Sequence, residues 1–201
     1  MANIQQCVFS ILWMDYVMNA PLASFVFLFT LIATHPSLAD QTSTELDNLF
    51  SDLKAAQNSK IAQPIAQQIW SIWLESEDQT IDALMEQGMN EVGNGNLSRG
   101  RNIFQEITER SPKFAEGWNK LATVNYMMGD IETSLVNIEK TLKLEPRHFG
   151  SISGRGLCYL KQRRWQSALI EFKAALDVHP WMLDARRNLK LLEENLENHA
   201  I

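Results

Sequence analysis

The chain has 201 residues and a formal net charge of −6 at pH 7. This acidic balance argues against a nucleic-acid-binding protein, and no interleaving of basic and aromatic residues of the RNA-binding kind is present. The roughly 160 residues that follow an apolar leader are enough to build one elongated domain with a continuous core.

Residues 1–39 form this leader, and Asp15 is their only charged residue. An apolar run of 12 residues ends at Ala33, and the small residues Ser37 and Ala39 then provide a site that suits a signal peptidase. Because a membrane-spanning helix needs about 20 apolar residues, the leader favours a signal peptide that is cleaved after Ala39. We therefore expect a periplasmic or secreted protein.

Two alternatives to cleavage stay open. The leader contains no Lys or Arg, so the basic segment that normally begins a signal peptide is missing. The leader is then either an uncleaved membrane anchor or begins at a misread start codon, with translation starting at Met14 or Met18. Cleavage would leave Cys158 as the only cysteine, which rules out an internal disulfide and favours a buried structural thiol.

Residues 40–80 show helical periodicity without a repeat and predict an N-terminal helical cap of two helices. We expect an interruption at Pro64 between the two apolar faces. Trp70 and Trp73 are expected in the core, and they would form an exposed docking site if the helices did not pack. The first face contains Leu46, Leu49, Phe50 and Leu53, and the second contains Ile65, Ile69, Ile72 and Trp73.

Residues 81–182 contain a pattern that recurs every 34 residues. A fixed period of this length is typical of a solenoid, whose units bury their apolar faces by stacking on one another. We place the units at residues 81–114, 115–148 and 149–182. The recurring positions are Gly88, Ala122 and Gly156; Gly100, Ser134 and Ala168; Phe104, Ile138 and Phe172; and Pro112, Pro146 and Pro180.

Each unit predicts a helical hairpin. In the central unit, Gly129 and Asp130 separate two stretches that have apolar residues at helical spacing. Pro146 ends the second stretch, because proline lacks the N–H that a helix needs. Residues 183–201 predict a C-terminal capping helix and tail, which would cover the last apolar face of the array.

This pattern resembles the tetratricopeptide repeat (TPR) family, and the stretches EGWN at Glu116 and EPRHFG at Glu145 are similar to short exported alphaproteobacterial TPR proteins. The resemblance implies an all-α fold: an α-solenoid of about three TPR helical hairpins with an N-terminal helical segment and a C-terminal capping helix. The third unit departs from the family pattern, because Arg163 and Arg164 stand at the usual Gly-Asp turn. The signature residues of the central unit are Trp118, Leu121, Ala122, Gly129, Ser134 and Pro146.

The first helix of each unit is expected to line a concave groove that binds a peptide or a partner protein. The family's clamp for the carboxylate of a chaperone tail is not matched, because Met85 and Met89 stand at two of its positions. The alternative is that Met85, Met89 and Leu157 are buried against neighbouring helices. The expected groove residues are Met85, Met89, Val92, Asn119, Thr123, Tyr126, Met127, Ser153, Leu157, Leu160 and Lys161.

The junction Leu144–Gly156 offers a second candidate surface. Arg147 and His148 would form an exposed recognition corner there. The alternative is structural: Phe149 packs between repeats, and Arg147 or His148 bonds carbonyl groups at a helix end.

Charge is unevenly distributed along the chain. Asp40–Ser98 contains ten acidic and two basic residues, a balance of −8, whereas Arg147–Lys190 contains nine basic and three acidic residues, a balance of +6. Such polarity can steer a partner that has an acidic segment toward the third unit. The alternative is a set of solvated charges without a partner.

Catalytic motifs are absent from the sequence. None of the four histidines lies in a metal-binding spacing, and there is no Cys-x-x-Cys, phosphate loop or Gly-x-Ser-x-Gly. We predict a non-enzymatic protein interaction module that needs no cofactor or metal. The alternatives are an envelope assembly or anchoring factor that docks through its Trp-containing N-terminal segment, and an accessory subunit of an enzyme complex.

Overall fold

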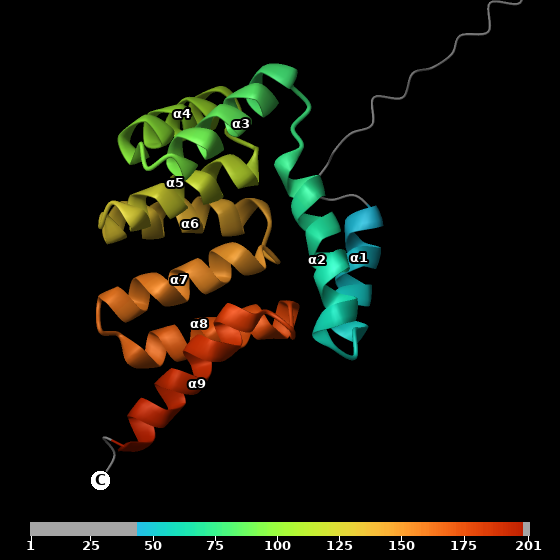
Figure 1. Cartoon of the computed structure of the whole chain (residues 1–201), viewed down its shortest axis with the longest axis vertical. Helices are drawn as coiled ribbons and strands as arrows, with labels where there is room; N and C mark the ends of the chain where they lie inside the picture. Colours follow the sequence, from blue (N-terminus) through green and yellow to red (C-terminus); the bar gives the residue numbers. More distant parts are fainter. Residues whose placement is uncertain (1–43, 199–201) are drawn as a thin grey trace, which may run out of the picture. The chain divides into compact units, whose positions relative to one another are not determined.

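The computed structural model describes residues 44–198, which form helices and no strand (Figure 1). The leader, its cleavage site and the alternative starts at Met14 and Met18 lie outside the described residues. Within the described range, none of the helices combines the length and apolar character that crossing a membrane requires. The helices are α1 Thr44–Ala55, α2 Ser59–Leu74, α3 Gln79–Gly93, α4 Leu97–Arg110, α5 Ala115–Met127, α6 Ile131–Leu144, α7 Phe149–Lys161, α8 Trp165–Val178 and α9 Leu183–Asn198.

Three helical hairpins, α3–α4, α5–α6 and α7–α8, stack in chain order in Figure 1. Helix α9 packs on α8, where Ala185 and Leu192 join the buried core around Phe172. The predicted all-α solenoid of three hairpins is confirmed. Cys158 is fully buried next to Ile138, as expected for a structural thiol.

The hairpins close through tight turns that place one residue in the left-handed region of backbone space. Gly95 and Gly129 have φ angles of 82° and 84° in the first two turns, which glycine adopts without steric cost. Arg163 occupies the equivalent place in the third turn with a φ of 58°. A side chain there is strained, so the third turn is built differently from the other two.

Helices α1 and α2 do not stack beyond the first hairpin, where a cap ahead of the array would lie. Their buried face instead forms one core with Phe149 at the start of α7. Trp181, in the loop between α8 and α9, donates a hydrogen bond of 2.7 Å from Nε1 to the carbonyl of Ala56. The N-terminal pair therefore packs beside the later hairpins, where Phe149 of α7 and Trp181 contact it.

Two details of this segment differ from expectation. Pro64 lies inside α2 and does not interrupt it, so the helix continues with one backbone hydrogen bond fewer. Trp73 is fully buried, and Trp70 is partly buried against the same core. The expected core position therefore holds for Trp73, whereas Trp70 also lines a cavity together with Asp184 of α9.

Glycine at the helix crossing of the third hairpin is a requirement of packing that can be tested. A Cβ atom at Gly156 would lie 2.8 Å from Cε1 of Phe172, whereas one at Gly154, on the same helix, would have only an ordinary contact of 3.7 Å with Ile138. We expect Gly156→Ala to lower the free energy of unfolding by about 1–3 kcal/mol through overpacking. The matched control Gly154→Ala should raise it by up to about 1 kcal/mol, because alanine favours helix. Urea unfolding measures both changes, and equal effects of the two variants would contradict this account.

Candidate functional site

A groove runs between helices α5 and α7 on one side and α9 on the other. Its central part is a cavity of about 210 Å³. Asn188 and Asp184 of α9 form one wall, together with Met182, which precedes the helix. The opposite wall contains five of the residues expected from the sequence: Asn119, Thr123, Tyr126, Ser153 and Leu157.

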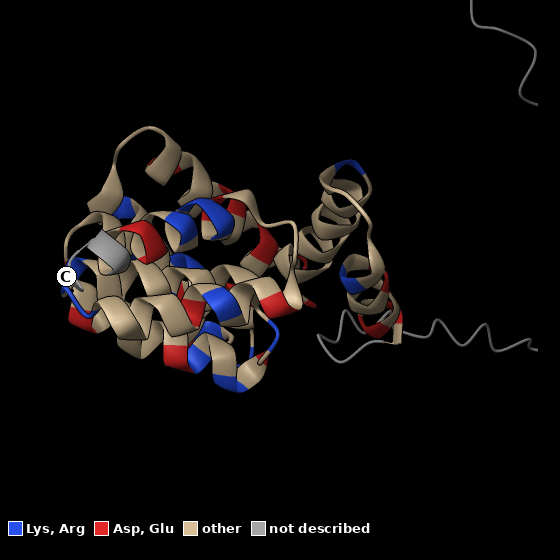
Figure 2. Cartoon of the chain, turned by 90° about the horizontal axis from the view of Figure 1, so that it is seen from below, with Lys and Arg blue, Asp and Glu red and all other residues tan. Residues whose placement is uncertain are grey.

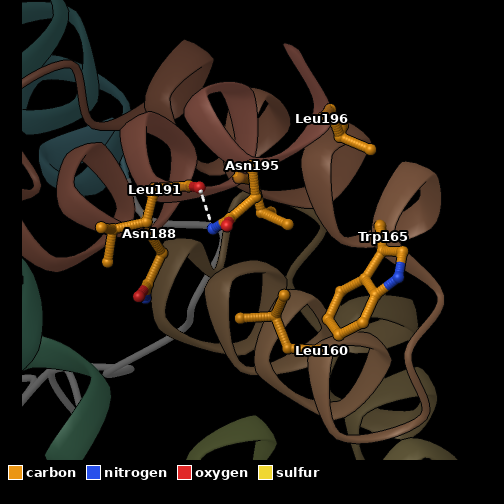
Figure 3. Close-up of a pocket in the computed structure, with 7 residues that line it drawn as sticks. Leu160, Trp165, Asn188, Leu191, Asn195 and Leu196 are labelled. Atoms are coloured by element: carbon orange, nitrogen blue, oxygen red, sulfur yellow. Dashed lines mark hydrogen bonds between the residues drawn. The ribbon is translucent and has the colours of Figure 1, made fainter. Parts of the chain in front are cut away.

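The groove extends in both directions along α9. Toward α2 lies a second cavity of about 350 Å³, which shares Met182 and Asp184 with the central one. Toward the C-terminal end of α9 lies a third cavity of about 470 Å³, which shares Asn188 (Figure 3). Because neighbouring cavities share wall residues, we treat them as one surface and call it the α9 groove.

The prediction that Met85 lines the groove is wrong, and Met89 and Val92 lie outside the cavities described above. Met85 is buried in the core that Phe104 and Ile107 form, and Met89 and Val92 pack partly buried against the same core. The side chains of these three residues stabilise the hairpin and do not line the groove cavities described above. Burial against neighbouring helices was the structural alternative for Met85 and Met89.

The remaining expected residues occupy different places. Leu160 lies in the end cavity, with Trp165 beside it (Figure 3). Met127 and Lys161 are exposed, but neither lines the three cavities. The accessible groove is therefore shifted from α3 toward α9, whose residues were expected only to cap the array.

A buried polar network forms the floor at the start of α5 and α7. Glu116 and His148 both have an exposed fraction of 0%. Nε2 of His148 lies 2.8 Å from Oε2 of Glu116, and Nζ of Lys120 lies 2.9 Å from Oε1. Nδ2 of Asn119 donates to the same carboxylate at 3.1–3.2 Å. The carboxylate is thus compensated by one charge and two further donors, as a buried charge requires.

The network also fixes the tautomer of His148. The backbone N–H of Ser151 donates to Nδ1 at 3.1 Å, which makes His148 the N-cap of α7. Nδ1 is therefore the acceptor nitrogen, and we assign the proton to Nε2, which donates to Glu116. Oγ of Ser151 donates to Oδ1 of Asn119 at 2.6 Å and closes the network.

The expected recognition corner at Arg147 and His148 is wrong. The imidazole of His148 stacks on Trp73 at 4.1 Å between ring centroids, so it is covered by α2. The guanidinium of Arg147 forms ion pairs with Glu145 and Asp47 and lies over the ring of Phe50. Both side chains hold the N-terminal pair against the array, and neither is free to recognise a partner.

Burial on its own would raise the pKa of Glu116. The hydrogen bond from His148 and the positive charge of Lys120 outweigh that effect, so the pKa of Glu116 is lowered from its ordinary value. The folded state therefore holds Glu116 as a carboxylate, and the stability that this ionised form contributes depends on pH.

Sequence reasoning missed Glu116 and Ser151 as partners of His148, and Lys120 as the partner of Glu116. A signal was nevertheless present, because the EGWN and EPRHFG stretches that contain Glu116 and His148 stood out from ordinary repeats. It also missed Asn188 and Asp184, since nothing in the sequence of α9 indicates which face lies toward α7.

Comparisons with known proteins agree with this fold. No family model matches the chain. A relative from Rhizobium etli, described as a TPR repeat-containing protein, is 32% identical over 151 residues, which cover 75% of this chain and 74% of the relative.

Two solved structures illustrate the structural similarity. The first TPR of Spaghetti (RPAP3) bound to an HSP90 peptide has a TM-score of 0.57 at 14% identity, covering 59% of this chain and 94% of that chain. The Yersinia enterocolitica type III secretion chaperone SycD, in complex with a peptide of the translocator YopD, has a TM-score of 0.55 at 11% identity, covering 59% and 96%. At these identities the likeness concerns the fold alone.

The role of the buried carboxylate can be tested through its pH dependence. At pH 7 we expect Glu116→Gln to lower the free energy of unfolding by about 3 kcal/mol, because Lys120 and His148 lose a charged partner. The pKa of Glu116 is lowered in the folded state, so the stability that its carboxylate contributes is fully present above the ordinary pKa of 4.5. That stability is lost as the pH falls through the pKa of Glu116 in the folded state. The difference between the wild type and the variant should therefore shrink below pH 4.5.

Urea unfolding at several pH values measures this difference. Glu139→Gln on α6 is the matched control, since Glu139 is exposed and its substitution removes the same charge. A difference between the wild type and Glu116→Gln that stays constant down to acid pH would contradict the assignment of an ionised Glu116.

Proposed function

Because the chain belongs to the family of TPR repeat-containing proteins, we propose that it is a non-enzymatic interaction module that binds an extended peptide segment of a partner protein in the α9 groove. The observation that carries this proposal is the continuity of the groove, whose three cavities share wall residues along one face of α9. A binding surface of this length suits an extended chain better than a compact small molecule.

The chemistry of the central cavity supports a peptide ligand. The amide of Asn188 and the hydroxyl of Tyr126 are groups that can bond the N–H and C=O groups of a peptide backbone. Leu157 and Met182 supply apolar surface between them, and methionine adapts to side chains of different shape. Peptides are also the bound partners in the Spaghetti and SycD structures, which share this fold.

Helix α2 sets the boundary of the groove at its N-terminal end. The indole of Trp70 lies so close to Gly150 that a Cβ atom there would be 2.7 Å from Cη2. Trp70 therefore covers part of the start of α7, although Gly150 still lines the central cavity and Trp70 itself lines the cavity toward α2.

Catalysis is not favoured by the one acid–base pair in this region. Glu116 and His148 are within hydrogen-bonding distance, but neither side chain is exposed to solvent. A general acid or base must reach its substrate directly or through one water molecule. The pair therefore fits a structural role, in keeping with an interaction module.

A photo-crosslinking residue at Thr123 tests the proposal directly. Thr123 is exposed and lines the central cavity, whereas Val136 on α6 is 54% exposed and outside it. In the native extract, we expect a crosslinker at Thr123 to capture a specific protein that a crosslinker at Val136 does not capture. Asn188→Arg in the Thr123 variant should abolish the product by filling the cavity, with the helical circular dichroism spectrum unchanged. Capture of the same proteins from both positions would contradict groove binding.

A further inference from the structure

The turn between α7 and α8 lacks two stabilising features that the turn of the second hairpin has. Arg163 has a φ of 58° where Gly95 and Gly129 have positive φ angles at no steric cost. Arg164 then stands at the N-cap of α8 and makes no capping hydrogen bond. The equivalent residue of the second hairpin, Asp130, accepts a capping bond from the N–H of Thr133 at 3.1 Å. Arg163 thus stands in place of the glycine of the second turn, and Arg164 stands in place of its capping aspartate.

The cations of this turn have no acidic partner within the part of the chain that the structure describes. Lys161, Arg163 and Arg164 form no ion pair there, although Arg155 on the same helix pairs with Glu171 at 2.8 Å. Nζ of Lys161 lies 6.0 Å from the ring centroid of Tyr126, and the guanidinium of Arg164 lies 4.3 Å from that of Tyr159. Acidic and basic residues are spread over the whole array in Figure 2, and other cations such as Lys140 and Lys143 also form no ion pair within the described residues. This turn differs in that two adjacent arginines stand where the second hairpin has Gly129 and Asp130.

An apolar cavity lies directly beside these cations. The end cavity of the α9 groove is lined by Leu160 and Trp165 on one side and by Leu191 of α9 on the other (Figure 3). Trp165 is 44% exposed and Leu191 is 51% exposed, so the apolar wall is accessible to a ligand. Lys161 follows Leu160 in the chain and Arg164 precedes Trp165, so the backbone of the turn adjoins the cavity, although the cations themselves are not among its lining residues.

We propose that this end of the groove binds an acidic segment of the partner protein, with one large apolar residue of that segment seated in the cavity. The inference rests on the proposed function, since the end cavity belongs to the same groove. Unpaired cations beside an apolar pocket are complementary to carboxylates that flank an apolar anchor. A protein segment fits better than a membrane surface, because the apolar side chains line a hollow of about 470 Å³ and Asn188 offers an amide to a peptide backbone.

The probe for the test is a fluorescein-labelled peptide of Asp and Glu with one central Phe. Fluorescence anisotropy should show that the wild type binds this peptide more tightly than a peptide with Ala for Phe, and more tightly than one with Asn and Gln for Asp and Glu. We expect the double variant Arg163→Gly, Arg164→Asp to weaken binding about tenfold or more. This variant restores the turn residues of the second hairpin, so its melting temperature should not fall below that of the wild type.

The matched control is the double variant Lys140→Gln, Lys143→Asp on α6. Both of these lysines are exposed, and the pair of substitutions changes the net charge by the same three units. The control should bind the peptide as the wild type does. An equal loss of affinity in the control would overturn the proposal, because attraction would then depend on net charge alone.

Three further results would also overturn the proposal. One is unchanged peptide binding by the Arg163→Gly, Arg164→Asp variant. Another is binding of that turn to phosphatidylglycerol vesicles without any preference for the acidic peptide. The third is self-association that Leu191→Glu abolishes, again without peptide binding. If one of these results is found while the crosslinker at Thr123 still captures a specific protein, only the acidic-segment proposal fails. If the crosslinker at Thr123 captures no specific protein, the proposed function fails.

Discussion

His148 donates a hydrogen bond to Glu116 between two helices, and neither side chain reaches solvent. Removing one partner would leave a buried carboxylate without compensation, which costs several kcal/mol. The same imidazole caps α7 through Ser151 and stacks on Trp73 of α2. His148 thus links α5, α7 and α2, and we expect the position of α2 to depend on it.

The position of α2 in turn decides which part of the array a partner can use. Trp70 covers the start of α7 at Gly150, and the first hairpin buries its methionines in its own core. The groove cavities lie along α9 and face α5, α7 and, at one end, α2. Asn119 of α5 serves both the buried network and the groove wall. The buried network and the groove wall therefore share residues, and a change in the network is expected to reshape the groove floor.

The fold could be predicted from the sequence because its determinants are local. Gly129 and Pro146 set where helices end, and Gly156 sets where two helices cross, each through properties that repeat every 34 residues. The burial of His148 could not be predicted in this way, since it depends on a partner 32 residues away and on Trp73 in a segment outside the repeat. The groove was expected along the first helix of each unit, and the part that α9 has in its wall could not be predicted because it depends on how α9 crosses α7.

Amide hydrogen exchange in the wild type and in His148→Ala tests most directly whether this residue holds α2 in place. The account predicts that α2, Ser59–Leu74, is protected in the wild type and exchanges roughly a hundredfold faster in the variant. The amides of α4, Leu97–Arg110, should keep their protection, because the first hairpin has its own core. Equal exchange of α2 in both proteins, or no protection of α2 in the wild type, would contradict the account.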